Sequence, residues 1–333
     1  MTDLSLARRA VIAGAGAGLV GLATRANAQT AMPEIEASEY WTQKGDVKLY
    51  LYRKRMAAKP GEKPPVVFLV HGSSISSRPS FDLTVPGKPG YSMMDDFAQH
   101  GFDVWTMDHE NYGHSSRTKS NSDITNGAAD LMAASEVVAK ETGARKVSYL
   151  GESSGAIRAG LFAQQAPDRV DRLVLCAFTY KGTGSPEIGR RAAIADKLRA
   201  SNTRLRDGGM IRSIFTRDKL PGAYDQAVAD AIAAEELKFG DQVPTGTYLD
   251  MAVNLPLVDP KKVLAPVLMV RGEFDGNSTN EDLLDFYTQL ANGDRQYVIL
   301  PQTAHSLGFA KNRHLLFYAV RNFLRAPAAI PAA

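Results

Sequence analysis

One serine of this chain sits in a segment that could make it a nucleophile. Ser153 is the centre of residues 151–155, which read GESSG and match the pattern G-x-S-x-G. An apolar run, 146–150, precedes the segment and a helix-like run, 156–166, follows it. In a strand–turn–helix context, flanking glycines allow a tight turn that lifts the serine hydroxyl clear of the sheet. The same pentapeptide also fits an ordinary Gly/Ser-rich turn, so its surroundings must decide.

A serine nucleophile needs two partners, and candidates for both follow later apolar runs. The hydroxyl is weakly reactive at neutral pH unless a base takes its proton and a third group orients that base. Asp275 follows the predicted strand 266–271, and His305 follows the predicted strand 296–300. The sequence therefore predicts Ser153 as nucleophile, His305 as base and Asp275 as the orienting acid.

Other acids and histidines fit these roles less well. Glu273 lies two residues before Asp275 and faces the same side of an extended segment, so it stays a rival acid. Asp282 and Asp285 fall on a predicted helix, where solvated carboxylates are expected. Of the histidines, only His305 directly follows the last predicted strand; the others are His71, His100, His109, His114 and His314.

Acyl transfer also requires donors aimed at the developing oxyanion. The backbone N–H of Ser154, directly after the nucleophile, is one candidate. The N–H of Ser73 is the second, because His71-Gly72 ends the buried run 65–70 and Gly72 lets the loop pass close to the site. Taken alone, the His-Gly pair also fits an ordinary turn at a strand end.

The sequence offers no support for a metal or another cofactor. No pair of histidines or cysteines has the spacing of metal ligands. The single cysteine, Cys176, lies in the apolar run 173–178 and is expected to behave as a small buried hydrophobe. We predict neither a metal site nor a cofactor site.

The N-terminus carries a glycine pattern that imitates a dinucleotide motif. Residues 16–21 read GAGLVG, but no second strand of a βαβ unit follows them. Arg8-Arg9, the uncharged apolar stretch up to Ala23, and the small residues Ala26 and Ala28 instead indicate a twin-arginine export signal over residues 1–28. The stretch is too short to span a bilayer. We expect a periplasmic or secreted bacterial protein without a stable membrane anchor.

Composition describes a globular chain without a strongly charged character. The 333 residues are 44% hydrophobic and carry a formal charge of +3. Cleavage after Ala28 removes three arginines and one aspartate, which lowers this charge to +1. A near-neutral protein gives no reason to expect a nucleic-acid partner. Oligomeric state stays open.

Buried strands alternate with helical patterns along most of the chain. An antiparallel pair is expected near residues 35–53, a long loop over 73–91, and a helix over 126–142. Residues 181–260 contain helical patches and no clear strand, and predicted strands lie on both sides of them. We therefore predict an α/β fold with a mostly parallel, doubly wound sheet, whose core (29–180 and 261–333) is interrupted by a helical cap (181–260).

Together these motifs resemble the α/β-hydrolase superfamily over most of residues 35–325. The family's His-Gly oxyanion turn is similar to segment 71–73, and its Asp-x-x-Gly-x-Gly-x-Ser loop loosely to segment 108–115, where Asn111 replaces a common glycine. The resemblance implies the same nucleophile, acid and base that the spacing indicates. The long 73–91 loop departs from the family pattern.

The expected activity is hydrolysis of a small-molecule carboxylic ester by a Ser-His-Asp triad through an acyl-enzyme. Apolar side chains of the cap would either line a pocket for an apolar acyl or aryl group or pack the cap onto the core; they are Met210, Ile214, Phe215, Tyr248 and Met251. Amide or peptide hydrolysis, lactone opening and carbon–carbon cleavage stay open, because a fold and triad do not choose between them. A non-catalytic binder that kept the fold is a further alternative.

Overall fold

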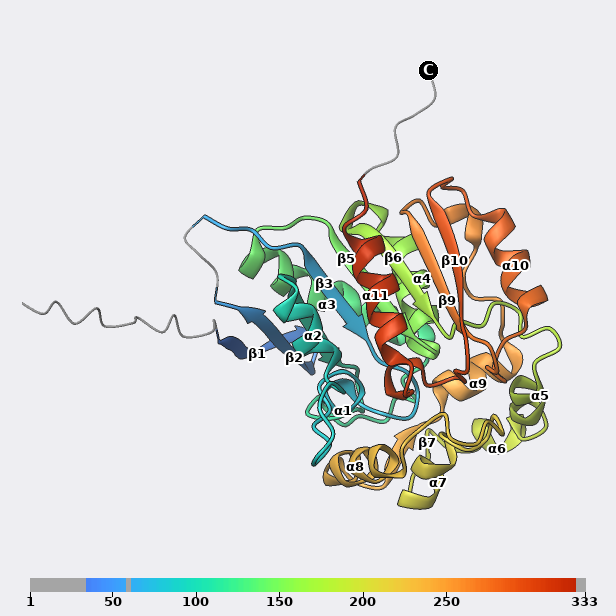
Figure 1. Cartoon of the computed structure of the whole chain (residues 1–333). Coiled ribbons are helices and arrows are strands. Elements are labelled where there is room, and N and C mark those ends of the chain that lie inside the picture. Colours follow the sequence, from blue (N-terminus) through green and yellow to red (C-terminus); the bar gives the residue numbers. More distant parts are fainter. Residues whose placement is uncertain (1–33, 58–60, 328–333) are drawn as a thin grey trace, which may run out of the picture. The chain divides into compact units, whose positions relative to one another are not determined.

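The computed structural model describes residues 34–57 and 61–327, so the export signal predicted for residues 1–28 lies outside the described residues. The core is an eight-stranded sheet in the order β1-β2-β4-β3-β5-β6-β9-β10 (Figure 1). The β1–β2 and β2–β4 pairs are antiparallel and the other pairs parallel. The strands are β1 (Ile35–Lys44), β2 (Val47–Met56), β3 (Val66–Val70), β4 (Asp103–Asp108), β5 (Val147–Glu152), β6 (Val170–Cys176), β9 (Val267–Gly272) and β10 (Arg295–Leu300).

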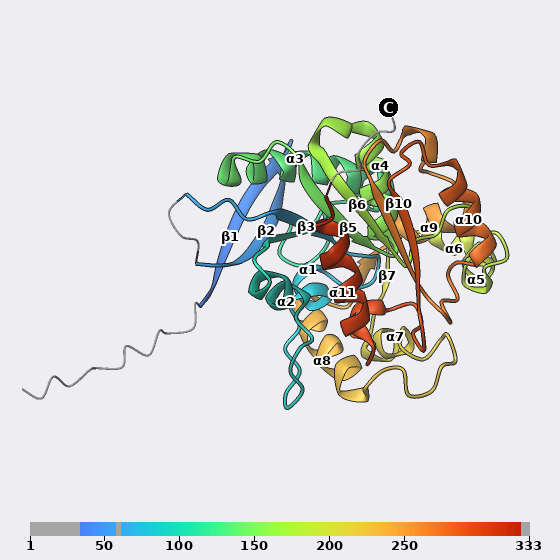
Figure 2. The same ribbon diagram turned by 45° about the horizontal axis from the view of Figure 1, so that its top comes forward.

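Helices cover both faces of this sheet, which confirms the predicted doubly wound fold. Figures 1 and 2 show α2 and α11 on one face and α3 and α4 on the other. The helices of these two layers are α2 (Met93–Gln99), α3 (Ile124–Thr142), α4 (Ser154–Gln165), α10 (Asn280–Gln289) and α11 (Arg313–Leu324). Each face has its own buried cluster: one contains side chains of α3, α4 and α10, the other side chains of α2 and α11.

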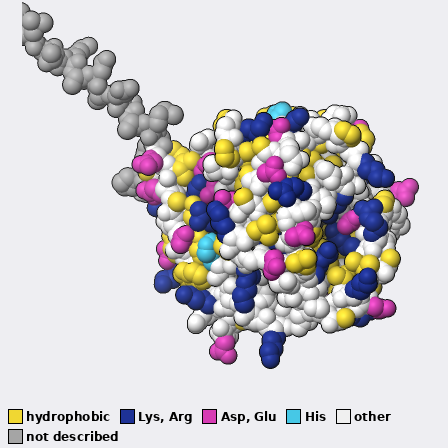
Figure 3. Space-filling model, turned by 90° about the horizontal axis from the view of Figure 1, so that it is seen from below, with side chains coloured by type: hydrophobic (Ala, Val, Ile, Leu, Met, Phe, Trp, Pro, Cys, Tyr) yellow, Lys and Arg dark blue, Asp and Glu magenta, His cyan; other side chains and the backbone are white. Residues whose placement is uncertain are grey.

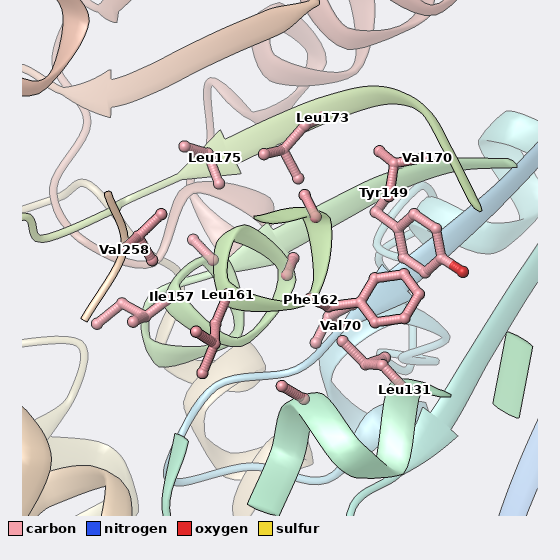
Figure 4. Packing of buried hydrophobic residues seen from close by; sticks show 14 of the residues in the cluster. Val70, Leu131, Tyr149, Ile157, Leu161, Phe162, Val170, Leu173, Leu175 and Val258 are labelled. Atoms are coloured by element: carbon pink, nitrogen blue, oxygen red, sulfur yellow. The ribbon is translucent and has the colours of Figure 1, made fainter. Parts of the chain in front are cut away.

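The helix α4 is packed firmly against the sheet and α3. Phe162 lies with its ring centroid 5.0 Å from that of Tyr149 on β5, and Leu131 of α3 belongs to the same cluster (Figure 4). These side chains are buried on α3, α4 and β5 alike. Burial of each large apolar side chain stabilises the fold by about 1.5–3 kcal/mol. The position of α4, and with it the turn at its N-terminus, is therefore fixed by the core.

Two glycines let α4 begin directly at the end of β5. A Cβ atom at Gly155 would lie 2.1 Å from the carbonyl oxygen of Val70 and 2.6 Å from that of His71. A Cβ atom at Gly151 would lie 2.3 Å from the carbonyl oxygen of Gly155. Neither space admits a side chain, so these positions require glycine for close backbone approach. The helix start is thereby held against the end of β3.

The segment between β6 and β9 forms the region where a helical cap was predicted. Figure 1 shows its helices along the lower end of the sheet, from α5 at the right to α8 below α1. Its elements are α5 (Pro186–Ala192), α6 (Ala195–Arg199), β7 (Thr203–Leu205), α7 (Gly208–Ser213), α8 (Gln226–Glu236), η2 (Leu237–Phe239), β8 (Gln242–Pro244), α9 (Gly246–Val253) and η3 (Pro260–Lys262). Short 3-10 turns elsewhere are η1 (Pro167–Arg169) and η4 (Leu307–Phe309).

Two expectations for the connecting segments were wrong in detail. The cap is not strandless, because β7 and β8 pair as an antiparallel ribbon. Each strand has only three residues and β7 is mostly exposed, so no alternation of apolar residues marks it. The 73–91 loop contains the helix α1 (Ser77–Phe81), which is too short to show a helical period. Among the described residues, every helix is too short or too polar to cross a bilayer.

The glycine at the start of α4 gives a stability prediction. We expect Gly155→Ala to destabilise the fold by about 3 kcal/mol, the upper end of the range for overpacking, because its Cβ would overlap backbone that cannot move aside. The matched control is Gly189→Ala on α5, where an added Cβ meets nothing within 4 Å and should stabilise by up to about 1 kcal/mol. Thermal unfolding measures both; equal unfolding temperatures would contradict the packing argument.

Candidate active site

Ser153 occupies the turn between β5 and α4 in a strained backbone conformation. Its φ is +59° and its ψ −124°, a backbone conformation that residues other than glycine rarely adopt. Its backbone N–H donates a hydrogen bond of 2.9 Å to the carbonyl of Cys176 at the end of β6. The turn therefore holds the serine at the carboxyl edge of the sheet, between the ends of two neighbouring parallel strands.

The structure brings His305 and Asp275 to Ser153. His305 Nε2 lies 2.9 Å from Ser153 Oγ, and His305 Nδ1 lies 2.8 Å from Asp275 Oδ1. Asp275 follows β9 and His305 follows β10, so adjacent strand ends supply the acid and the histidine. With a proton on Nδ1, the ring donates to Asp275 and leaves Nε2 free to accept from the serine hydroxyl.

Asp275 is held in its ionised form. Burial raises the pKa of its carboxyl group, but the attraction and hydrogen bond of His305 and the backbone N–H of Asn277 outweigh burial and leave the pKa below its ordinary value. The Asn277 N–H lies 2.8 Å from Asp275 Oδ1. A carboxylate rather than a carboxylic acid therefore faces the imidazole.

The rival acids have other partners. Glu273 Oε2 accepts the backbone N–H of Gln302 at 2.8 Å. Asp282 accepts the backbone N–H groups of Tyr180 and Lys181 and so joins the start of α10 to the segment after β6. Asp285 pairs with the Lys181 ammonium at 2.6 Å. Each of these carboxylates therefore has a structural contact that accounts for it.

Two other histidines form a buried support beneath the oxyanion turn. The backbone N–H of His109 donates to His71 Nε2 at 3.2 Å, and His109 Nδ1 lies 3.1 Å from Asp130 Oδ2. Burial lowers the pKa of both imidazoles well below the usual range. Both rings are therefore neutral at physiological pH and shape the turn.

The predicted oxyanion donors lie on both sides of Ser153. A Cβ atom at Gly72 would lie 3.3 Å from Ser153 Cβ, so the 71–73 turn passes directly beside the serine. Ser73 Oγ donates to Ser154 Oγ at 2.7 Å, which ties the two candidate residues together. Among the described residues, no protein group accepts a hydrogen bond from the N–H of Ser73 or of Ser154.

The cap fixes this turn from the opposite side. Thr247 Oγ1 on α9 donates to Ser73 Oγ at 2.8 Å. Ser74 Oγ lies 2.6 Å from the Tyr248 hydroxyl, also on α9. From the core, the Tyr112 hydroxyl donates to the Ser73 carbonyl at 2.9 Å. Core and cap therefore both restrain the segment that presents the Ser73 N–H.

Two more cap residues hold the loop that carries His305. Asp218 Oδ2 accepts the His305 backbone N–H at 3.0 Å, and the Tyr224 hydroxyl accepts the Ser306 N–H at 3.0 Å. Sequence analysis missed both residues. Neither belongs to a periodic or motif-like pattern, and only the folded position of the cap places them against this loop.

A small pocket opens beside Ser153 and His305. Of the five apolar cap residues considered from the sequence, only Ile214 lines it; Met251, for example, is part of the core packing. The start of the 73–91 loop forms another wall. The lining residues are Gly72, Ser73, Ser74, Ile75, Ser80, Glu152, Ser153, Arg191, Ile214, Arg217, His305, Ser306 and Phe309.

Glu152 is the one carboxyl group of this lining. Burial, and then the negative charge of Asp275, raise its pKa to about 7. Near neutral pH the group is therefore only partly ionised. The two arginines of the lining, Arg191 and Arg217, both come from the cap and were not singled out in the sequence.

Comparisons with known proteins agree on the fold. The model of the family described as serine aminopeptidase, S33 matches residues 90–312. No curated protein matches the chain in sequence.

Solved structures with the same fold include hydrolases of several kinds. E-2-(acetamidomethylene)succinate hydrolase is 20% identical, with a TM-score of 0.63 over 87% of this chain and 100% of that one. A 2-hydroxy-6-oxo-6-phenylhexa-2,4-dienoate hydrolase from a Rhodococcus strain is 18% identical, with a TM-score of 0.62 over 88% and 100%. A thermophilic esterase from Thermogutta terrifontis is 18% identical, with a TM-score of 0.59 over 87% and 98%. At these identities the similarity establishes the fold alone.

The raised pKa of Glu152 predicts a pH-dependent stability. Since the folded-state pKa of about 7 exceeds the ordinary value of 4.5, the folded protein holds a proton that the unfolded chain releases. The stability of the wild type relative to Glu152→Gln should therefore be greatest near pH 4 and fall by up to about 3 kcal/mol as the pH rises through 7. The free energy of unfolding of both proteins is measured between pH 4 and 8. A difference in this free energy that does not vary with pH would contradict the prediction.

Proposed function

Because the chain belongs to the serine aminopeptidase S33 family of the α/β-hydrolase superfamily, we propose that it is a serine hydrolase that cleaves a carboxylic ester. The observation that carries the proposal is the unbroken hydrogen-bonded series from Ser153 Oγ through His305 to Asp275, at 2.9 and 2.8 Å. This arrangement is what an uncharged serine hydroxyl requires in order to attack an acyl carbon.

Each group then has one role in a two-step reaction. His305 Nε2 takes the hydroxyl proton as Ser153 Oγ bonds to the acyl carbon, and it returns that proton to the departing alcohol oxygen. Water, deprotonated by the same nitrogen, releases the carboxylic acid and restores the serine. Asp275 stabilises the imidazolium. The N–H groups of Ser73 and Ser154 bind the oxyanion, a contribution on the order of 3 kcal/mol for each donor.

The pocket charges favour an ester over the N-terminus of a peptide. An aminopeptidase must bind a cationic amine close to the scissile bond. Here the lining presents the guanidinium groups of Arg191 and Arg217, and its single carboxyl group, Glu152, is only partly ionised near neutral pH. A positively charged pocket repels an ammonium group. Lactone opening and carbon–carbon cleavage use the same triad and stay as alternatives.

Replacing the nucleophile tests the proposal directly. We expect Ser153→Ala to lower kcat on 4-nitrophenyl butyrate by at least about 10³-fold, because no other group can form the acyl-enzyme. Ser201→Ala, an exposed serine of the cap, is the matched control and should keep wild-type activity. Steady-state rates measure both. Wild-type activity in Ser153→Ala would exclude the proposed nucleophile.

A panel of substrates separates the remaining alternatives. Purified protein would be given a short ester, a lactone, an amide and a diketone of comparable size, with Ser153→Ala as the blank for each. We expect the highest kcat/KM on the ester. Ser153-dependent activity confined to the diketone or the amide would instead assign the site to carbon–carbon or amide hydrolysis.

We also propose export through the twin-arginine route. The support is in the sequence: Arg8-Arg9, the apolar stretch after them, and the small residues before Gln29. N-terminal sequencing of the protein from a bacterial periplasmic fraction should find Gln29 as the first residue. Full-length protein confined to the cytoplasm would contradict this proposal.

A further inference from the structure

Two arginines of the cap reach the pocket that holds Ser153. Arg191 lies on α5, and Arg217 lies beyond the end of α7. Arg191 is only 7% exposed, and the Arg217 side chain is 19% exposed. Burying guanidinium groups beside an active site is costly unless their charge is compensated. The groups that neutralise these two charges, or fail to, therefore indicate which kind of ligand the pocket binds.

The protein itself compensates only part of this charge. Glu187 Oε1 lies 3.3 Å from Arg191 Nε and 3.7 Å from Arg217 Nη1, and Glu187 Oε2 also pairs with Arg190. The Glu187 carboxylate is thus the ion-pair partner of three guanidinium groups. Burial raises the pKa of Glu187, but these arginines outweigh burial and lower it. The carboxylate is therefore ionised. Asp275 also attracts Arg217, so two carboxylates face three guanidinium groups and one positive charge is left over.

Donor groups on the same two side chains lack a strong acceptor. Arg217 Nε is buried and has no hydrogen-bond partner among the described residues. Arg191 Nη1 has only the methionine sulfur of Met251, at 3.1 Å, a weak acceptor. The Arg191 guanidinium also lies over the Tyr248 ring, 5.4 Å from its centroid. The ring and the thioether hold Arg191 in place without neutralising it.

Arg191 and Arg217 also line a neighbouring cavity. A second cavity shares Ser74, Arg191, Ile214 and Arg217 with the Ser153 pocket. Its remaining lining adds two more arginines, and Glu187 is its one acidic residue; these further residues are Glu187, Arg190, Ile194, Arg204, Met210, Ser213 and Tyr248. Figure 3 shows Lys and Arg side chains spread over the face seen from below, with Asp and Glu side chains among them. This neighbouring cavity is therefore basic and attracts anions.

Apolar side chains also line the pocket that holds the nucleophile and the arginines. Ile75, Ile214 and Phe309 line the same pocket as Ser153. These side chains suit a short hydrocarbon segment, whereas a guanidinium pair suits a planar carboxylate, which it can bind through paired N–H donors. The lining thus combines a nucleophile, apolar side chains and two guanidinium groups.

We propose that the substrate of Ser153 carries a carboxylate, separated from the scissile ester by a short apolar segment and bound by N–H donors of Arg191 and Arg217 on the side that lines the pocket. The inference rests on the proposed esterase function and names its substrate class: small carboxylated esters such as monoesters of dicarboxylic acids. Arg191 and Arg217 are the specificity-determining residues. They attract the anion and align the ester with the nucleophile, and take no part in the bond making.

Matched pairs of esters test this inference. On the acyl side, 4-nitrophenyl monoesters of succinate, glutarate and adipate are compared with neutral 4-nitrophenyl esters of equal chain length. On the alcohol side, 4-(butyryloxy)benzoate is compared with its methyl ester. For the wild type, we expect kcat/KM at least about tenfold higher for the carboxylated member of one pair, since charged hydrogen bonds discriminate by this factor or more.

Arginine variants then locate the source of the preference. Arg217→Gln and Arg191→Gln should each lower kcat/KM for the carboxylated ester about tenfold more than for its neutral partner, and Arg217→Lys should restore part of the loss. Arg212→Gln is the control, since Arg212 belongs to the same cap but pairs with Asp230 at its surface. This control should keep the wild-type ratio. If Arg191→Gln fails to fold, the test uses the variants of Arg217, whose side chain is more exposed.

The outcomes separate the inference from the function on which it rests. Absence of any Ser153-dependent hydrolysis overturns the proposed function. Ser153-dependent hydrolysis of the neutral esters, with no carboxylate preference in any pair, overturns the carboxylate site alone. A preference that Arg217→Gln leaves unchanged also overturns it. Competitive inhibition by glutarate that weakens in Arg217→Gln, at constant ionic strength, is the expected independent result.

Discussion

The close approach of Gly155 to the carbonyl oxygens of Val70 and His71 is the contact on which the arrangement of the site depends. It brings the first turn of α4 against the end of β3, so that the strained serine and the 71–73 turn lie side by side. A side chain at position 155 would separate them. The nucleophile and one oxyanion donor are therefore positioned by a single backbone contact, which the buried packing of α4 maintains.

The region between β6 and β9 does more than cover this site. Asp218 and Tyr224 accept the backbone N–H groups of His305 and Ser306, and Thr247 holds the Ser73 hydroxyl. The loop of the base and the oxyanion turn belong to the core, yet both are restrained from the cap. The same region supplies the arginines of the pocket, so geometry and substrate charge preference originate in one segment.

Sequence patterns predicted the parts of the site that follow from sheet topology. Ser153, Asp275 and His305 each follow a buried apolar run, and parallel strands end at one edge of a sheet, so their meeting could be predicted from order alone. The rival acid Glu273 could not be set aside in this way, because only the structure shows that it binds the Gln302 N–H.

The remaining contacts had no comparable signal. Asp218, Arg191 and Arg217 lie in a segment of short helices and turns, where no strand end or helical period directs a side chain. Their positions depend on how the cap packs on the core, which is a property of the whole fold. For the same reason, the expectation of an apolar pocket was incomplete. The cap contributes two guanidinium groups to the pocket as well as Ile214.

The central claim is that Ser153 forms a covalent intermediate, and active-site labelling measures this most directly. The protein would be treated with a fluorophosphonate, digested, and analysed by peptide mass spectrometry, with and without prior heat denaturation. The account predicts a single phosphonylated residue, Ser153, only in the folded protein. Absence of labelling in folded protein, or labelling at another serine, would contradict it.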